Sequence, residues 1–75
     1  MEWKYRAGDV ITISKNYKYV VVGKKEEACF GGLQRFISFY TIMDTSLGVG
    51  VGPLCQVPDF VFEEMVKMAM DKQKE

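Results

Sequence analysis

The residues that could carry out covalent or metal chemistry are few in this chain of 75 residues. There are two cysteines, Cys29 and Cys55, and no histidine. Two separate cysteines cannot build a four-ligand zinc site without help from carboxylates, and without histidine the commonest general base near neutral pH is missing. The sequence therefore predicts no enzymatic activity, no metal site and no cofactor. We expect both cysteines to pack in or near the core as small hydrophobic residues, although two thiols also suffice for one disulfide bond.

Three glycines, Gly48, Gly50 and Gly52, alternate with apolar residues in one segment. A phosphate-binding loop would need G-x-x-x-x-G-K-[ST] and a dinucleotide-binding turn G-x-G-x-x-G, and neither spacing is present. We interpret the segment as a strand over residues 47–52 whose bare side is packed closely by an aromatic ring or by a helix. The alternative is that this bare side lines a pocket for a small ligand or nucleotide, within one chain or at a subunit interface.

Basic and aromatic residues interleave between Lys15 and Tyr19. Rings such as those of Tyr17 and Tyr19 stack on bases, while side chains such as Lys15 and Lys18 contact phosphates. The chain carries no net charge and its pI is about 6.2, so it lacks the basic footprint of most nucleic-acid-binding domains. We therefore expect these four residues to form a loop that binds another protein. A nucleic-acid-binding small barrel that uses this hairpin is the alternative.

The last part of the chain has the periodicity of an amphipathic helix over residues 59–72. Asp59 suits its N-terminal end, where the helix dipole favours acidic side chains. The apolar stripe is wider than a small sheet needs for cover, and it is rich in methionine, which adapts to varied binding surfaces. We therefore expect Phe62, Met65 and Met68 to bind a partner protein or a second copy of the chain.

These candidate residues need a sheet to position them, and the segment that organises the sheet is Phe36–Met43. Six of its eight residues are aromatic or aliphatic, and none is charged, glycine or proline. That composition predicts a central strand with most of both faces covered.

Shorter patterns predict the remaining elements. We expect further strands and connections as follows: strands at 1–7, 10–14, 19–22 and 47–52, a short strand or connector at 54–57, and a loop at 25–33 with a strand extension through Glu26 as an alternative. Ile11 and Ile13 are expected in the core. Asn16 suits the left-handed backbone of a hairpin turn, and Gly23 is expected to end its strand.

The step Ala7-Gly8-Asp9-Val10, followed by Ile11-Thr12-Ile13, resembles the first strand of SH3-like small β-barrels. The resemblance implies an antiparallel barrel that binds peptides, nucleic acid or proteins through its loops and one open edge. The hairpin around Tyr17 would then be the binding loop. The helix after residue 58 departs from this layout, so the alternative is a bent sheet of four or five strands with helix 59–72 across one face.

The sequence thus predicts a single mainly β domain with one C-terminal helix. No segment reaches the roughly 20 apolar residues needed to span a bilayer, so we expect no membrane contact and an intracellular, cytoplasmic location with reduced thiols. The leading functional hypothesis is a non-enzymatic module that binds another protein, such as a small adaptor, regulator or inhibitor of bacterial or phage origin. It would act through a loop, an edge or the apolar helix, and it could form a homodimer.

Overall fold

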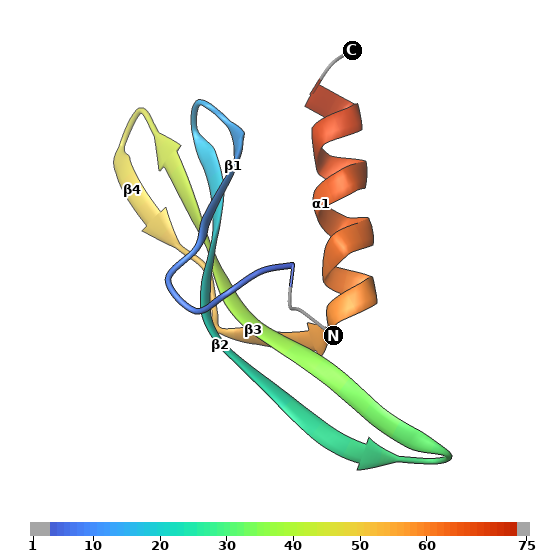
Figure 1. The fold of residues 1–75 in the computed structure, drawn as a ribbon. Helices are drawn as coiled ribbons and strands as arrows, with labels where there is room; N and C mark the ends of the chain where they lie inside the picture. Colours follow the sequence, from blue (N-terminus) through green and yellow to red (C-terminus); the bar gives the residue numbers. More distant parts are fainter. Residues whose placement is uncertain (1–3, 74–75) are drawn as a thin grey trace.

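In the computed structural model, which describes residues 4–73, an antiparallel sheet of five strands is followed by one helix (Figure 1). The elements in chain order are β1 (Val10–Ser14), β2 (Tyr17–Cys29), β3 (Gly32–Thr45), β4 (Gly48–Val51), β5 (Cys55–Pro58) and α1 (Asp59–Gln73). The mainly β fold with a C-terminal helix is therefore confirmed.

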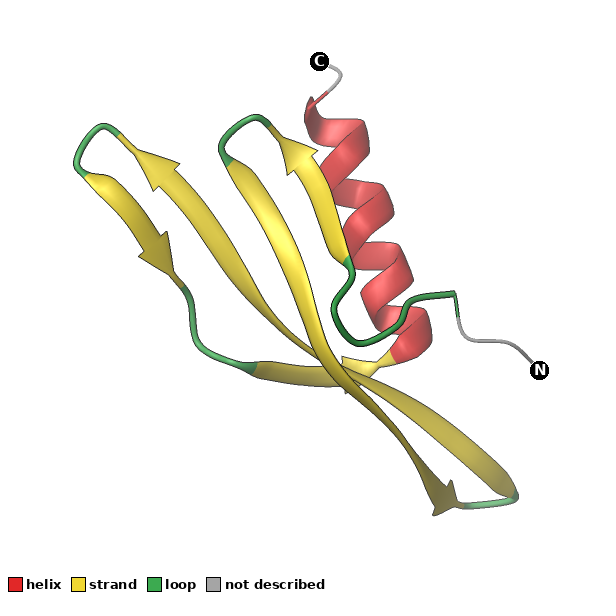
Figure 2. Cartoon of the chain, turned by 60° about the vertical axis from the view of Figure 1, so that its left-hand side comes forward, coloured by secondary structure: helices red, strands yellow, loops and turns green. Residues whose placement is uncertain are grey.

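The central strand of the sheet is β3, as the apolar run Phe36–Met43 predicts. It pairs with β2 along one edge, while its other edge is shared by β5, beside Phe36–Phe39, and by β4, beside Ile42–Thr45. The strand order is β1-β2-β3-β4, with β5 beside β3, and β1 does not pair with β4. The expectation of a closed SH3-like barrel is therefore wrong. The alternative, a bent sheet with the helix across one face, is confirmed (Figure 2).

The hydrophobic core lies between α1 and one face of the sheet. Among the described residues, seven are buried in it, namely Ile13, Tyr19, Val21, Ile37, Phe39, Phe62 and Val66. Strand side chains alternate between the two faces, and paired residues of neighbouring strands share a face. Val21 and Phe39, which pair across β2 and β3, therefore both point towards α1. Phe62 is fully buried, and its ring centroid lies 5.1 Å from that of Tyr5, 5.8 Å from Tyr19 and 4.8 Å from Phe39.

The strand β2 continues far beyond the glycine that was expected to end it. The register shifts between Val21 and Gly23, and Gly23 then pairs with Ser38. This glycine therefore marks a β-bulge and does not end the strand, because a bulge offsets the pairing without breaking it. The predicted loop at 25–33 is wrong, since most of it is strand.

Beyond Phe36, where β5 ends its pairing, β2 and β3 run on as two strands alone. We call residues 26–35 the hairpin arm. Figure 1 shows it projecting away from the rest of the sheet, past the start of α1. A tight turn at Phe30-Gly31 closes it, and Gly31 has a φ of +78°, a value that glycine adopts at little cost.

The N-terminal segment differs from its predicted strand. Residues 1–3 lie outside the described part, and residues 4–9 form bends and turns. The Gly8-Asp9 turn is confirmed: the Arg6 amide donates to Asp9 Oδ2 (2.9 Å), and the Asp9 carbonyl accepts from Val21 (2.9 Å). The segment is thereby tied to β2 without becoming a strand.

Three smaller expectations have clear outcomes. Ile13 is buried and Ile11 packs against the core, as predicted. Asn16 does not adopt the left-handed backbone expected of it, because every described residue with a positive φ is a glycine. In the described part of the chain, no helix is both long enough and apolar enough to cross a bilayer.

Candidate functional site

The tip of the hairpin arm exposes apolar side chains. Phe30, in the turn, is fully exposed, and Leu33, the third residue after it, is 72% exposed. Leu33 pairs with Ala28 across the arm, so no large side chain opposite can shield it. Two large hydrophobic residues thus lie in water at the end of a projecting hairpin, a position in which folding alone gains nothing from them.

A hollow of about 640 Å³ lies between the arm tip and the start of α1. We call it the arm hollow; its lining consists of residues 29–35 from the arm and of Asp59, Phe60 and Glu63 from the helix. Phe60, on the first turn of α1, is 59% exposed. Apolar side chains from two segments that are far apart in sequence therefore surround one concavity.

The charges of the arm and its base are largely paired with one another. Arg35 Nε lies 3.6 Å from Glu26 Oε1, and Lys25 Nζ lies 2.7 Å from Glu27 Oε1 and 5.8 Å from the ring centroid of Phe36. Exposed pairs of this kind contribute little to stability. They do leave the arm with nearly balanced charge. A ligand would therefore bind to the arm mainly through apolar side chains and backbone hydrogen-bonding groups.

The free edge of β3 borders the arm hollow. β5 hydrogen-bonds to β3 only as far as Phe36, and α1 begins immediately after β5, at Asp59. On this edge, residues 32–34 therefore have no neighbouring strand among the described residues. An unpaired edge presents backbone N–H and C=O groups that can pair with another extended chain.

Most of the residues that the sequence proposed as a binding surface lie inside the molecule. Tyr19 and Phe62 belong to the core, and Tyr17 and Met65 pack against it. Those four side chains are brought together by the packing of α1 on the sheet. A ligand could not reach Tyr19 or Phe62 without opening the core.

The other three proposed residues are accessible but separated. Lys15 is exposed in the turn between β1 and β2, and Lys18 is half-buried on the sheet face opposite α1. Met68 is 67% exposed on α1. These three side chains belong to different surfaces and form no common site.

Tyr17 and Tyr19 form an edge-to-face pair. Their ring centroids are 5.4 Å apart, and the hydroxyl of Tyr17 donates to that of Tyr19 over 3.4 Å, which is long for such a bond. Burial, and then the Tyr17 hydroxyl and its charge, raise the pKa of Tyr19 to about 12. Rings held in this way contribute to the core, and they are not presented for stacking on bases.

The glycine-rich strand β4 leaves a second hollow, of about 270 Å³. Its lining residues are Thr41, Met43, Thr45, Gly50, Val51 and Gly52. The expectation that an aromatic ring or the helix would pack against the bare glycines is wrong, because neither belongs to this lining. A Cβ at Gly52 would lie 3.6 Å from Thr41, and one at Gly50 would lie 3.8 Å from the Met43 carbonyl oxygen.

The two cysteines are exposed and unbonded, which corrects the expectation that they lie in or near the core. Cys29 is at the arm tip, beyond the helix, and Cys55 opens β5, where its thiol lies 3.6 Å from the Pro53 carbonyl oxygen. Among residues 4–73, no three Cys, Asp or Glu side chains cluster closely enough to hold a metal ion.

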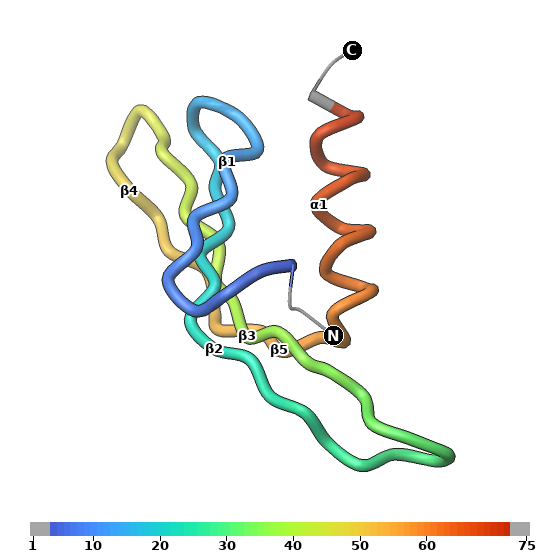
Figure 3. Tube along the Cα trace, viewed as in Figure 1, coloured from blue at the N-terminus to red at the C-terminus, as the bar shows by residue number. Residues whose placement is uncertain are grey.

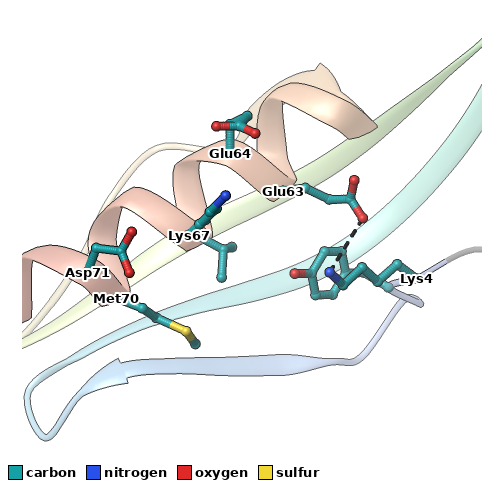
Figure 4. Close-up of a pocket in the computed structure, with 8 residues that line it drawn as sticks. Lys4, Glu63, Glu64, Lys67, Met70 and Asp71 are labelled. Atoms are coloured by element: carbon teal, nitrogen blue, oxygen red, sulfur yellow. Dashed lines mark ion pairs between the residues drawn. The ribbon is translucent and has the colours of Figure 1, made fainter.

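A third hollow, of about 480 Å³, lies between the N-terminal segment and α1 (Figure 4). Side chains of both charges surround it, and Lys4 Nζ lies 3.6 Å from Glu63 Oε1. Figure 4 shows Lys67 and Asp71 on the same stretch of helix. Because the opposite charges are interspersed, this hollow has no strong preference for a ligand of either sign.

The tube in Figure 3 traces the arm as one continuous excursion, out along β2 and back along β3. Sequence reasoning missed it, yet a signal was present: Gly31-Gly32 lies between two polar segments, and Glu26 on one side pairs with Arg35 on the other. In comparisons with known proteins, no family model, no curated protein and no solved structure matches the chain.

Proposed function

We propose that this chain is a non-enzymatic protein-binding module, and that an extended segment of its partner docks in the arm hollow. The observation that supports this most strongly is the clustering of three exposed apolar residues, Phe30, Leu33 and Phe60, around one concavity. Exposed apolar side chains that gather at a hollow are typical of protein interfaces.

The free edge of β3 supports strand addition as the mode of binding. An extended segment beside residues 32–34 would continue the line of β5 and would gain backbone hydrogen bonds from the free edge. Its side chains would alternate, so that those on one face meet Leu33 and Phe60. Asp59, which also lines the hollow, favours a basic residue nearby in the partner.

The experiment that tests this uses a photo-crosslinking residue at position 33 and a matched control at position 47. Leu47 is likewise an exposed leucine, but it lies in the turn between β3 and β4, away from the arm hollow. We expect one protein to be crosslinked from position 33, in amounts that fall with Phe60→Asp and are unaffected by Leu47→Asp. Equal crosslinking from both positions, or no effect of Phe60→Asp, would contradict the proposal.

The hollow at β4 supports a second candidate function, the binding of a small apolar ligand. Its lining is almost wholly apolar, and Gly50 can accept a side chain, because a Cβ there meets only ordinary contacts. Gly50→Val would therefore fill the hollow while keeping the strand. A metabolite that raises the melting temperature of the natural chain, but not that of Gly50→Val, would support this function; an equal rise in both would exclude this hollow as its site.

A further inference from the structure

We propose that the sheet face opposite α1 binds the same face of a second copy of this chain, which makes the protein a homodimer. This surface is separate from the arm hollow, so the inference does not depend on the proposed function. The evidence lies in the register of the strands, in the exposure of the side chains and in two charges of opposite sign.

The strand register defines this open face. The side chains that point away from α1 include those of Val10 and Thr12 on β1, Lys18, Val20 and Lys25 on β2, Phe36, Ser38, Tyr40, Ile42 and Asp44 on β3, Val49 and Val51 on β4, and Gln56 on β5. They form rows across the sheet, because paired residues of neighbouring strands point to the same side. One row is Val10–Val20–Tyr40, and the next ends in Ile42–Val51.

The open face is largely apolar and has no covering layer. Figure 2 shows α1 behind the sheet and no described element in front of it. Val51 is 64% exposed, and Val10 and Val49 are similarly exposed. A sheet whose two faces are both apolar gains stability when each is buried against another layer. The helix supplies the layer on one side only.

The charges on the open face favour a second copy over an unrelated protein. Lys18 stands beside Ile42, and Asp44 lies two residues further along β3 on the same face, so the two are diagonal neighbours. Such diagonal positions are about 7–8 Å apart, and among the described residues neither side chain forms an ion pair. A two-fold axis between them places each Lys18 opposite Asp44 of the other copy, as a self-complementary interface requires.

The overall charge is also compatible with self-association. The chain has ten basic and ten acidic residues and therefore no net charge, so two copies do not repel one another at long range. A face with charges of one sign only would not allow such pairing. On the open face, Lys18 and Asp44 lie near the β1–β2 and β3–β4 turns, while Lys25, beside Phe36 on the same face, already pairs with Glu27.

The first test is the mass in solution, measured by sedimentation equilibrium from low to high micromolar concentration. We expect the mass of two 8.6-kDa chains for the natural sequence, and one chain for Val51→Lys, whose exposed site tolerates the change. Met68→Lys, an equally exposed apolar site on α1, should leave the dimer intact. A single-chain mass for the natural protein throughout, or a dimer lost only with Met68→Lys, overturns the proposal.

The second test is a charge exchange. Lys18→Asp alone and Asp44→Lys alone each place like charges face to face and should weaken the dimer by roughly tenfold or more. The double variant restores opposite charges and should return within about threefold of the natural dissociation constant. Circular dichroism checks that each variant is folded. If the double variant dimerises more weakly than either single variant, Lys18 does not face Asp44 of the other copy and the proposed pairing is wrong.

Discussion

The two halves of the β2–β3 hairpin are built from the same pair of strands but have opposite surroundings. In the half near β1, Tyr19, Val21 and Phe39 are buried beneath α1. In the other half, beyond the bulge at Gly23, every residue from 24 to 33 is exposed. The hydrogen-bonded pairing of the backbone continues through both halves, so strand pairing extends further than the core does.

The difference shows what each kind of interaction contributes. The buried half is stabilised by burial of apolar side chains against the helix, at about 25 cal/mol per Å² of apolar surface. The arm has only its cross-strand pairs, each of which contributes a few tenths of a kcal/mol up to about 1 kcal/mol. The buried half should therefore determine whether the chain folds, while the arm is available for binding.

The largest effect is expected at the centre of the buried half. Phe62→Ala removes a fully buried ring that contacts three other aromatic rings, and such truncations cost about 3–5 kcal/mol. Chemical denaturation should show this loss. Phe60→Ala, two residues earlier on the exposed side, is the control and should cost less than about 1 kcal/mol. Similar losses of stability for both variants would mean that buried and exposed side chains do not differ in what they contribute to folding.

A smaller effect is expected from pH, again in the buried half. The pKa of Tyr19 is raised from 10.0 to about 12 in the folded chain. The stability that the protonated Tyr19 hydroxyl contributes is therefore fully present below pH 10. Between pH 10 and 12 the unfolded chain loses this proton while the folded chain keeps it, so stability falls as the pH rises, by at most about 3 kcal/mol. Denaturation series over this pH range should show a smaller fall in the free energy of unfolding for Tyr19→Phe than for the natural chain. An identical fall in both would mean that other groups cause it.

In the arm, a change of about 1 kcal/mol is expected at the turn. Gly31 has a φ of +78°, which strains any residue with a side chain. Gly31→Ala should therefore loosen the tip, seen as faster amide exchange in residues 26–35, and should leave exchange at Tyr19–Val21 unchanged. Gly32→Ala is the matched control, because its backbone is not left-handed and a Cβ there meets nothing. Faster exchange in both halves would mean that they unfold together.

The smallest effect is expected for an ion pair at the base of the arm. Glu27→Gln removes the partner of Lys25, yet exposed pairs contribute about 0–1 kcal/mol. The free energy of unfolding should therefore change by less than about 0.5 kcal/mol, and the change should be smaller still in high salt. A loss above 1 kcal/mol would show that the charges of the arm support the fold.

The elements that could be predicted are those with a local pattern. The uninterrupted apolar run Phe36–Met43 indicates the central strand, and the repeat after Asp59 indicates the helix. The arm has no such pattern, because its strands depend on pairing with each other and not on an apolar face. Gly23 was misinterpreted for the same reason: glycine suits both a strand end and a bulge, and only the partner strand decides between them.

The candidate site was harder to predict than the fold. The sequence shows that Tyr19 and Phe62 are aromatic, and it does not show whether such rings face a core or a partner. That depends on how α1 crosses the sheet, which involves residues more than 40 positions apart. Phe30 and Leu33, by contrast, were placed in a loop, so their exposure at a projecting tip could not be anticipated.

The bulge at Gly23 also sets the direction of the arm. Phe30 is the seventh residue after Gly23, and at about 3.3 Å per residue the tip lies about 23 Å from the bulge. A bulge bends its strand and increases the local twist, so this one sets the direction in which the arm leaves the sheet. A difference of about 10° in that bend would displace Phe30 by about 4 Å and change the width of the arm hollow by a similar amount. The geometry of one bulge thus decides where the arm tip lies relative to α1.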